Sequence, residues 1–210
     1  MTYQLPFTSI IGVGIITFAG LAILVNQDPR ERRLSILAYI LLYIGTVFLL
    51  FRIFSVQILF ILFLTGLAGG MILGTDHIDL HAGIHRPAIT PGILFMAVFG
   101  SVLWVMVLSI EPRIAVWIPV PDSVLFSALW MIVVGIAAIS LNDDHFQLFL
   151  GLLLVFFGFE LVYILLEDSS LVFAFLTAIN LLIALAGAYV LSKPEDDPEI
   201  SEDSDLDLFE

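Results

Sequence analysis

Glu160 is the residue of this chain whose type and position point most directly to chemistry. It lies inside the apolar run from Leu148 to Leu166. An ionised carboxylate costs roughly a few kcal/mol or more in lipid, so Glu160 is expected to be protonated, paired or exposed to a hydrated cavity. A carboxyl group that exchanges a proton there could serve a proton relay. The other interpretation is structural: a protonated Glu160 hydrogen-bonds a neighbouring helix and holds the two helices together. We favour the first interpretation because intramembrane acids usually mark functional sites.

Asn180 and Thr177 are the polar residues expected beside Glu160. They lie three residues apart in the next apolar segment, and therefore on one face of a helix. At about 1.5 Å per residue from the same side of the membrane, Glu160 stands roughly 20 Å up its helix, Asn180 roughly 17 Å and Thr177 roughly 21 Å. Either side chain can donate to an ionised carboxylate or accept from a protonated one. The sequence thus predicts a candidate proton path formed by Glu160, Asn180 and Thr177.

Two further sets of residues are interpreted more conservatively. Tyr39 and Tyr43 are four residues apart, so they form a mildly polar stripe on one helix, which we interpret as a packing seam rather than a path. His77, His81 and His85 have the spacing of one helix face and could contribute metal ligands if their segment were helical. Glycine and proline residues in this segment favour an irregular loop, so we expect solvated histidines and keep a metal site as the weaker alternative.

Composition excludes several classes of function. The chain has no cysteine, so it has neither disulfides nor metal–thiolate sites, and it contains no nucleophile elbow, zinc-protease motif or phosphate-binding loop. We therefore expect no cofactor and no catalytic centre of its own, although the chain could be a subunit of an enzyme complex. The net charge of −13 and the seven Lys and Arg residues exclude a nucleic-acid partner.

The element type that must position these side chains is the transmembrane helix. Hydrophobic residues make up 60% of the 210 residues and charged residues 13%, a composition that excludes a water-soluble domain and makes lipid the solvent. We predict an all-α, polytopic bundle of about seven transmembrane helices, since a helix needs about 20 apolar residues to cross the bilayer. The predicted spans are 8–26, 34–52, 56–74, 92–110, 123–141, 147–166 and 170–191.

The charges between the predicted spans indicate an orientation. Five Lys and Arg residues fall on one side of the membrane and two, Arg52 and Arg113, on the other. By the positive-inside rule, the N-terminus lies outside and the C-terminus in the cytoplasm. Residues 194–210 hold nine of the twenty acidic residues and are expected to form a disordered cytoplasmic tail. This tail either keeps the end of the chain soluble or, through its last apolar residues, docks on another subunit.

A weak internal repeat suggests how the helices are grouped. A shift of 113 positions places Gly45 on Gly158, and a shift of 112 places Thr65 on Thr177. Leu- and Phe-rich helices also produce such matches by chance, so a duplication is one of two open interpretations. If it is real, two parallel three-helix repeats are joined by a connector helix. The corresponding units are residues 1–75, a segment 76–122 with a polar loop, the fourth helix and an outer loop, a second unit 123–193, and the tail 194–210.

Glycines in these helices are interpreted as close-packing positions rather than binding loops. Gly66, Gly70 and Gly74 follow one another at intervals of four, which gives their helix a face of small residues for a neighbouring helix. We place Gly158 in the same class.

The segment from Leu154 to Leu161, with Gly158 two residues before Glu160, resembles the Gly-x-Glu signature on the middle helix of the three-helix K subunit of respiratory complex I. Its relatives include the C subunit of Mrp-type antiporters and the longer E subunit of group-4 hydrogenases, which is similar in length to this chain. That family carries a second intramembrane Glu, and the matching position here is Asn180. In the first unit, the position matching Glu160 is Val47.

The resemblance implies a non-redox membrane subunit beside larger antiporter-like, hydrogenase or quinone-reductase subunits, in a complex that moves protons or monovalent cations across a prokaryotic plasma membrane. Glu160 would then contribute one carboxylate to a lateral proton path. Because Asn180 replaces the second acid, a relay of two carboxylates within this chain is not implied. The alternative is a self-contained small transporter or an assembly scaffold in which Glu160 only fixes helix packing.

Overall fold

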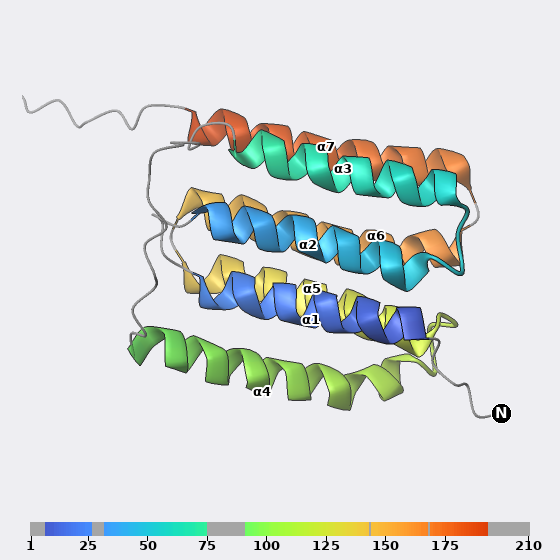
Figure 1. Ribbon diagram of the computed structural model, residues 1–210, viewed down its shortest axis with the longest axis horizontal. Coiled ribbons are helices and arrows are strands. Elements are labelled where there is room, and N and C mark those ends of the chain that lie inside the picture. Colours follow the sequence, from blue (N-terminus) through green and yellow to red (C-terminus); the bar gives the residue numbers. More distant parts are fainter. Residues whose placement is uncertain (1–6, 27–31, 75–90, 143, 168, 193–210) are drawn as a thin grey trace, which may run out of the picture.

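A computed structural model of the chain describes residues 7–26, 32–74, 91–142, 144–167 and 169–192. These residues form seven α-helices and no strands, which confirms the predicted all-α bundle (Figure 1). Each helix is long and apolar enough to cross a membrane, as expected of an integral membrane protein. The helices are α1 (Phe7–Val25), α2 (Arg32–Leu50), α3 (Val56–Gly74), α4 (Pro91–Ile114), α5 (Asp122–Leu141), α6 (His145–Leu166) and α7 (Ser170–Leu191).

The predicted spans match these helices except at the end of α4. The sequence predicted that this span ends at residue 110 and that the outer loop follows, but the helix continues through Pro112 to Ile114. A proline this close to the end of a helix removes its own amide donor but leaves the following turn able to close. The backbone NH of Ala115 still donates to the carbonyl of Glu111 at 2.9 Å.

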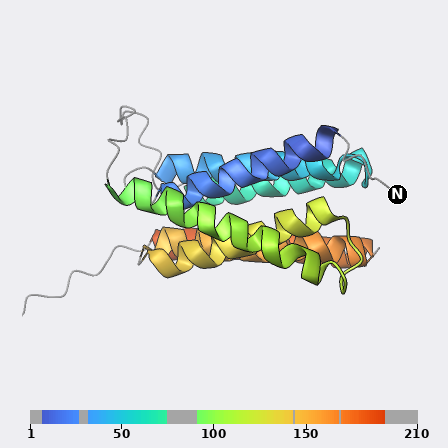
Figure 2. The same cartoon turned by 90° about the horizontal axis from the view of Figure 1, so that it is seen from below.

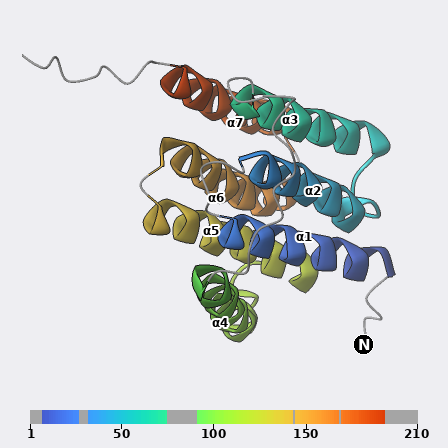
Figure 3. The same cartoon turned by 60° about the vertical axis from the view of Figure 1, so that its left-hand side comes forward.

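Six of the helices form two layers with the same internal order. Helices α1, α2 and α3 make the first layer, and α5, α6 and α7 make the second layer behind it (Figures 1 and 2). Helix α1 packs beside α5 and α3 beside α7, so the second layer lies over the first without a change of order or direction. Helix α4 packs on the edge formed by α1 and α5 (Figure 3).

Each layer is held together by close contact between its first two helices. A Cβ atom added to Gly45 of α2 would stand 3.1 Å from the carbonyl oxygen of Gly12 in α1, and one added to Gly158 of α6 would stand 2.7 Å from that of Ala128 in α5. The other neighbours also correspond, because each glycine faces residues three and four positions further along the facing helix. These are Ile15 and Ile16 for Gly45, and Met131 and Ile132 for Gly158.

The correspondence extends along both helix pairs. Residues of α1 and α5 match at a separation of 116 positions, which aligns Gly12 with Ala128, Ile16 with Ile132 and Asn26 with Asn142 directly after each helix. Residues of α2 and α6 match at 113 positions. The two layers therefore use small residues at equivalent places to bring their first two helices together, a pattern typical of membrane helix packing.

Large side chains fill the space between the layers. Trp130, Phe146 and Phe157 of the second layer and Tyr39 and Tyr43 of the first are all at most 1% exposed. Most of the core is therefore aromatic and aliphatic. Any polar group placed within it must find its hydrogen-bond partners inside the protein.

Candidate functional site

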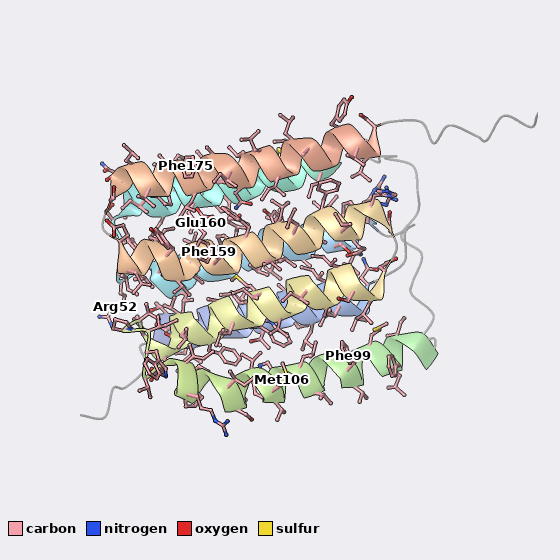
Figure 4. All side chains as sticks on the ribbon, turned by 180° about the vertical axis from the view of Figure 1, so that it is seen from behind. Arg52, Phe99, Met106, Phe159, Glu160 and Phe175 are labelled. Carbon is pink, nitrogen blue, oxygen red and sulfur yellow. The ribbon has the colours of Figure 1, made fainter. Side chains whose placement is uncertain are left out.

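Glu160 is buried in the core between the two layers. It lies on α6, six residues before the end of the helix, and is 1% exposed. In Figure 4, Glu160 lies in the space between α6 and α7, while Phe159, the preceding residue, is 49% exposed. The structure therefore places the carboxyl group away from lipid, where the environment disfavours its charged form unless partners compensate.

The structure brings together the three residues that the sequence predicts for the proton path. Thr177 Oγ1 donates to one carboxylate oxygen of Glu160 at 3.4 Å, and Asn180 Nδ2 donates to the other at 3.4 Å. Both donors come from α7, because residues three apart share one face of a helix. Both contacts are long for hydrogen bonds of this kind, so they compensate an ionised carboxylate only weakly.

Two tyrosines of the first layer extend this group. Asn180 Nδ2 also donates to the hydroxyl oxygen of Tyr43 at 2.7 Å, and the Tyr39 hydroxyl donates to the Tyr43 oxygen at 3.3 Å. The Tyr43 ring stacks on Phe157 of α6, with 3.9 Å between the ring centroids. We call Glu160, Thr177, Asn180, Tyr43 and Tyr39 the polar cluster; it joins the second layer to the first.

Glycines of α3 make room for the two tyrosines. A Cβ atom at Gly66 would clash with the ring of Tyr43, and one at Gly69 would stand 3.2 Å from the Tyr39 hydroxyl. Gly70 and Gly74 continue the same face and would meet Ile40 and Ile36 of α2, each at 3.1 Å. The glycines of α3 thus lie against α2, and Gly66 and Gly69 form part of the wall of the polar cluster.

Asn180 provides the polar cluster with an unused acceptor. Its side chain is 2% exposed, and its Oδ1 atom has no hydrogen-bond partner among the described residues. A half-turn of the amide would exchange Oδ1 and Nδ2. The same residue can then donate to an ionised carboxylate or accept from a protonated one, so the cluster can accommodate both protonation states of Glu160 without a change in the backbone.

No basic residue in the described part of the chain neutralises Glu160. The one ion pair found there joins Arg32 and Asp144 at 3.1 Å, in a second polar group at the opposite end of α6. In that group, Gln147 Nε2 donates to the backbone carbonyl of Asn26 at 3.2 Å, which again links the two layers. Asp144 is paired with Arg32, whereas Glu160 has no basic partner among the described residues. Glu160 therefore has to lose its charge or gain hydrogen-bond partners when it is buried.

Several residues named from the sequence lie outside the described residues. They are His77, His81 and His85 and the acidic tail 194–210. Within the described part of the chain, no group of three or more His, Asp or Glu side chains could hold a metal ion.

The sequence did not identify Tyr43 as part of the site. We interpreted the pair Tyr39 and Tyr43 as a packing seam, and the stacking of Tyr43 on Phe157 agrees with that, but its hydroxyl also binds Asn180. One signal was available: Tyr43 stands roughly 14 Å up its predicted span when counted like Glu160, within roughly 3 Å of the depth of Asn180. The identity of the neighbouring helices was the missing information.

Comparison of the chain with protein-family models, with curated proteins and with solved structures finds no match.

Proposed function

We propose that this chain is a non-redox integral membrane subunit of a complex that translocates protons or monovalent cations, and that Glu160 is its reversible proton-binding group. The observation that carries the proposal is the unpaired burial of Glu160: a carboxyl group 1% exposed, with two long contacts and no basic partner in the described part of the chain. A group held in this way changes its protonation state at a lower cost than one locked in an ion pair.

The arrangement around Glu160 supports reversible binding of a proton at that residue. Asn180 contacts both Glu160 and Tyr43 through the same nitrogen, and Tyr39 follows along α2. Hydroxyl groups both donate and accept, so Tyr43 and Tyr39 can rearrange their hydrogen bonds when Glu160 gains or loses a proton, while Asn180 reorients and carries no proton itself. The proton therefore enters and leaves at Glu160, and the row of hydrogen bonds from the second layer into the first adjusts to its charge.

The resemblance to the K subunit of complex I, the Mrp C subunit and the hydrogenase E subunit supports the same class of partner. On that basis we propose larger antiporter-like, hydrogenase or quinone-reductase subunits as neighbours, in a prokaryotic plasma membrane. The distribution of basic residues supports an N-terminus outside and a C-terminus in the cytoplasm. With Asn180 in place of a second acid, Glu160 supplies the single intramembrane carboxylate of the proton path.

A scaffold or a self-contained transporter is the second candidate, and one observation favours the scaffold. The shortest hydrogen bond of the polar cluster joins Asn180 to Tyr43 at 2.7 Å, which fixes one layer to the other without involving Glu160. In that case Glu160 stays protonated and serves only the packing of α6 against α7.

Glu160→Gln separates the two functions, because glutamine keeps the shape and hydrogen bonding of a protonated Glu160 and abolishes titration. The tagged protein is purified in a mild detergent with whatever accompanies it, its partners are identified by mass spectrometry, and the preparation is reconstituted in liposomes. We expect antiporter-like or hydrogenase-type subunits to be recovered with both forms. Proton uptake, followed with a pH-sensitive dye, should be lost in the variant.

Glu167→Gln is the matched control, since Glu167 follows the end of α6 and is exposed. It should leave proton uptake unchanged. Undiminished uptake by Glu160→Gln in a complete assembly would overturn the proton-carrying role, and loss of the assembly itself would favour the scaffold.

A further inference from the structure

The outer face of the first layer carries an open apolar groove. The groove has a volume of about 330 Å³ and lies between α1 and α2. Phe18 and Ala22 of α1 and Leu37, Leu41 and Ile44 of α2 are among its lining residues. In an isolated chain this face would be covered by lipid alone.

The equivalent residues of the second layer show what such a face binds. Their positions follow from the separations of 116 residues for α1 and α5 and 113 residues for α2 and α6. They are Val134, Ala138, Leu150, Leu154 and Phe157. All five are buried, and Phe157 stacks on Tyr43 of the first layer. The groove on the first layer therefore corresponds to the inner face of the second layer. That inner face packs against all three helices of the first layer.

The outer face of the second layer has the complementary position. Tyr39 and Tyr43 are among the residues by which α2 contacts the second layer, and their equivalents on α6 are Leu152 and Phe156. Phe156 belongs to an aromatic row with Phe159, at 6.4 Å between ring centroids, and Phe159 and Leu152 are 49% and 39% exposed. One chain thus presents both halves of the contact that its own layers make internally.

The two outer faces also match in polarity. At the internal contact, the Tyr43 hydroxyl meets Asn180 beside Glu160. On the outer faces, Phe156 occupies the position of Tyr43, while Val47 and Ala68 occupy the positions of Glu160 and Asn180. At these three positions the outer faces therefore lack the hydroxyl, carboxyl and amide groups that meet at the internal contact, so none of these groups would be left without a partner.

We propose that a second copy of this chain stacks on the first through these two faces, repeating the internal contact. Phe156 of one copy then packs against Ile44 of the next, as Tyr43 packs against Phe157 within the chain. The contact is heterologous, because different surfaces meet, so a row of copies can grow in the membrane plane. Helix α4 packs on the α1 and α5 edge and leaves both faces open. This inference does not depend on the proposed function.

The absence of cysteine makes a direct cross-linking test available. Ile44→Cys and Phe156→Cys are placed on two differently tagged copies, which are expressed together and treated in native membranes with a short thiol-specific cross-linker. We expect an adduct that carries both tags when one copy has the Ile44→Cys substitution and the other has Phe156→Cys. Two copies that share the same substitution should give none. Val98→Cys on α4 is the control for random collisions, because Val98 is 58% exposed and lies outside both faces. When Val98→Cys is used in place of Ile44→Cys or of Phe156→Cys, we expect no adduct above the level of random collisions.

Three outcomes would decide the matter. A mixed adduct above the Val98→Cys background supports the stack. Adducts between identical positions would overturn it, because they require a symmetric dimer, and absence of any adduct would overturn it as well. To exclude misfolding, each variant must elute as a single species in mild detergent, and Glu160→Gln in the same background should leave the adduct unchanged.

Discussion

The first and second layers share their packing and differ in their polar residues. Gly45 and Gly158 bring α2 onto α1 and α6 onto α5 in the same way, with contacts at corresponding positions. The acid and the amide of the polar cluster occur in the second layer alone, because Val47 stands where Glu160 would be and Ala68 where Asn180 would be. One backbone arrangement therefore accommodates either an apolar or a polar set of side chains.

The difference between the layers follows from what each face meets. The face of the second layer that carries Glu160 is covered by the first layer, whose Tyr43 supplies a hydroxyl group to Asn180. The equivalent face of the first layer has no partner within the chain, and in a single copy a charged carboxyl group there would face lipid at a cost of about 3 kcal/mol. Glu160 and Asn180 thus lie at the interface where a hydroxyl partner is built into the chain.

The largest effect is expected from breaking the packing that the layers share. Gly45→Val and Gly158→Val each force a branched side chain into a place where even a Cβ atom stands 3.1 Å or less from a backbone carbonyl oxygen. Because the facing backbone cannot give way cheaply, we expect each variant to lose roughly 3 kcal/mol or more of unfolding free energy. Thermal unfolding in detergent should show similar losses for both variants.

Gly14→Val is the control for this pair, since nothing lies within 4 Å of a Cβ atom at Gly14. It should unfold like the unchanged protein. If Gly45→Val were tolerated and Gly158→Val were not, the two layers would differ in packing, and the comparison between them would fail.

The seven transmembrane helices were the most predictable part of the molecule, and the polar cluster was predictable only in part. Continuous apolar segments identify transmembrane helices because lipid leaves the backbone no other partner, and Glu160, Thr177 and Asn180 could be joined by depth on adjacent helices. Tyr43 could not be assigned, because the stacking of one layer on the other depends on packing between segments distant in sequence. The end of α4 was missed because Pro112 indicates a helix end by composition, although its position near the last turn is tolerated.

A smaller loss of unfolding free energy is expected at Tyr43, which differs from its equivalent Phe156 by one hydroxyl group. Tyr43→Phe gives α2 the residue that α6 has at Phe156, keeps the ring stack on Phe157 and removes the oxygen that accepts from Asn180 at 2.7 Å. We expect a loss of about 1 kcal/mol in unfolding free energy, the usual net value of one hydrogen bond. Chemical denaturation in detergent would measure it.

Tyr163→Phe makes the same change on α6 at a half-buried site outside the polar cluster. We expect a change within about 0.5 kcal/mol there, as for most surface substitutions. Equal losses for the two variants would mean that the bond between Tyr43 and Asn180 contributes nothing specific to the contact between the layers.

The smallest effect is expected at the Arg32 and Asp144 ion pair, which joins the layers at the other end of α6. The two side chains are 18% and 14% exposed, and Asp144 also accepts from the backbone NH of Phe146 at 3.2 Å as the N-cap of α6. Asp144→Asn keeps a capping residue and removes the charge, so it isolates the ion pair from the cap. A double-mutant cycle with Arg32→Gln should give a coupling of about 0.2–1 kcal/mol that falls as salt is added, because water reaches both groups. A coupling well above this range would show instead that the ion pair holds the layers together as firmly as the glycine contacts hold each layer.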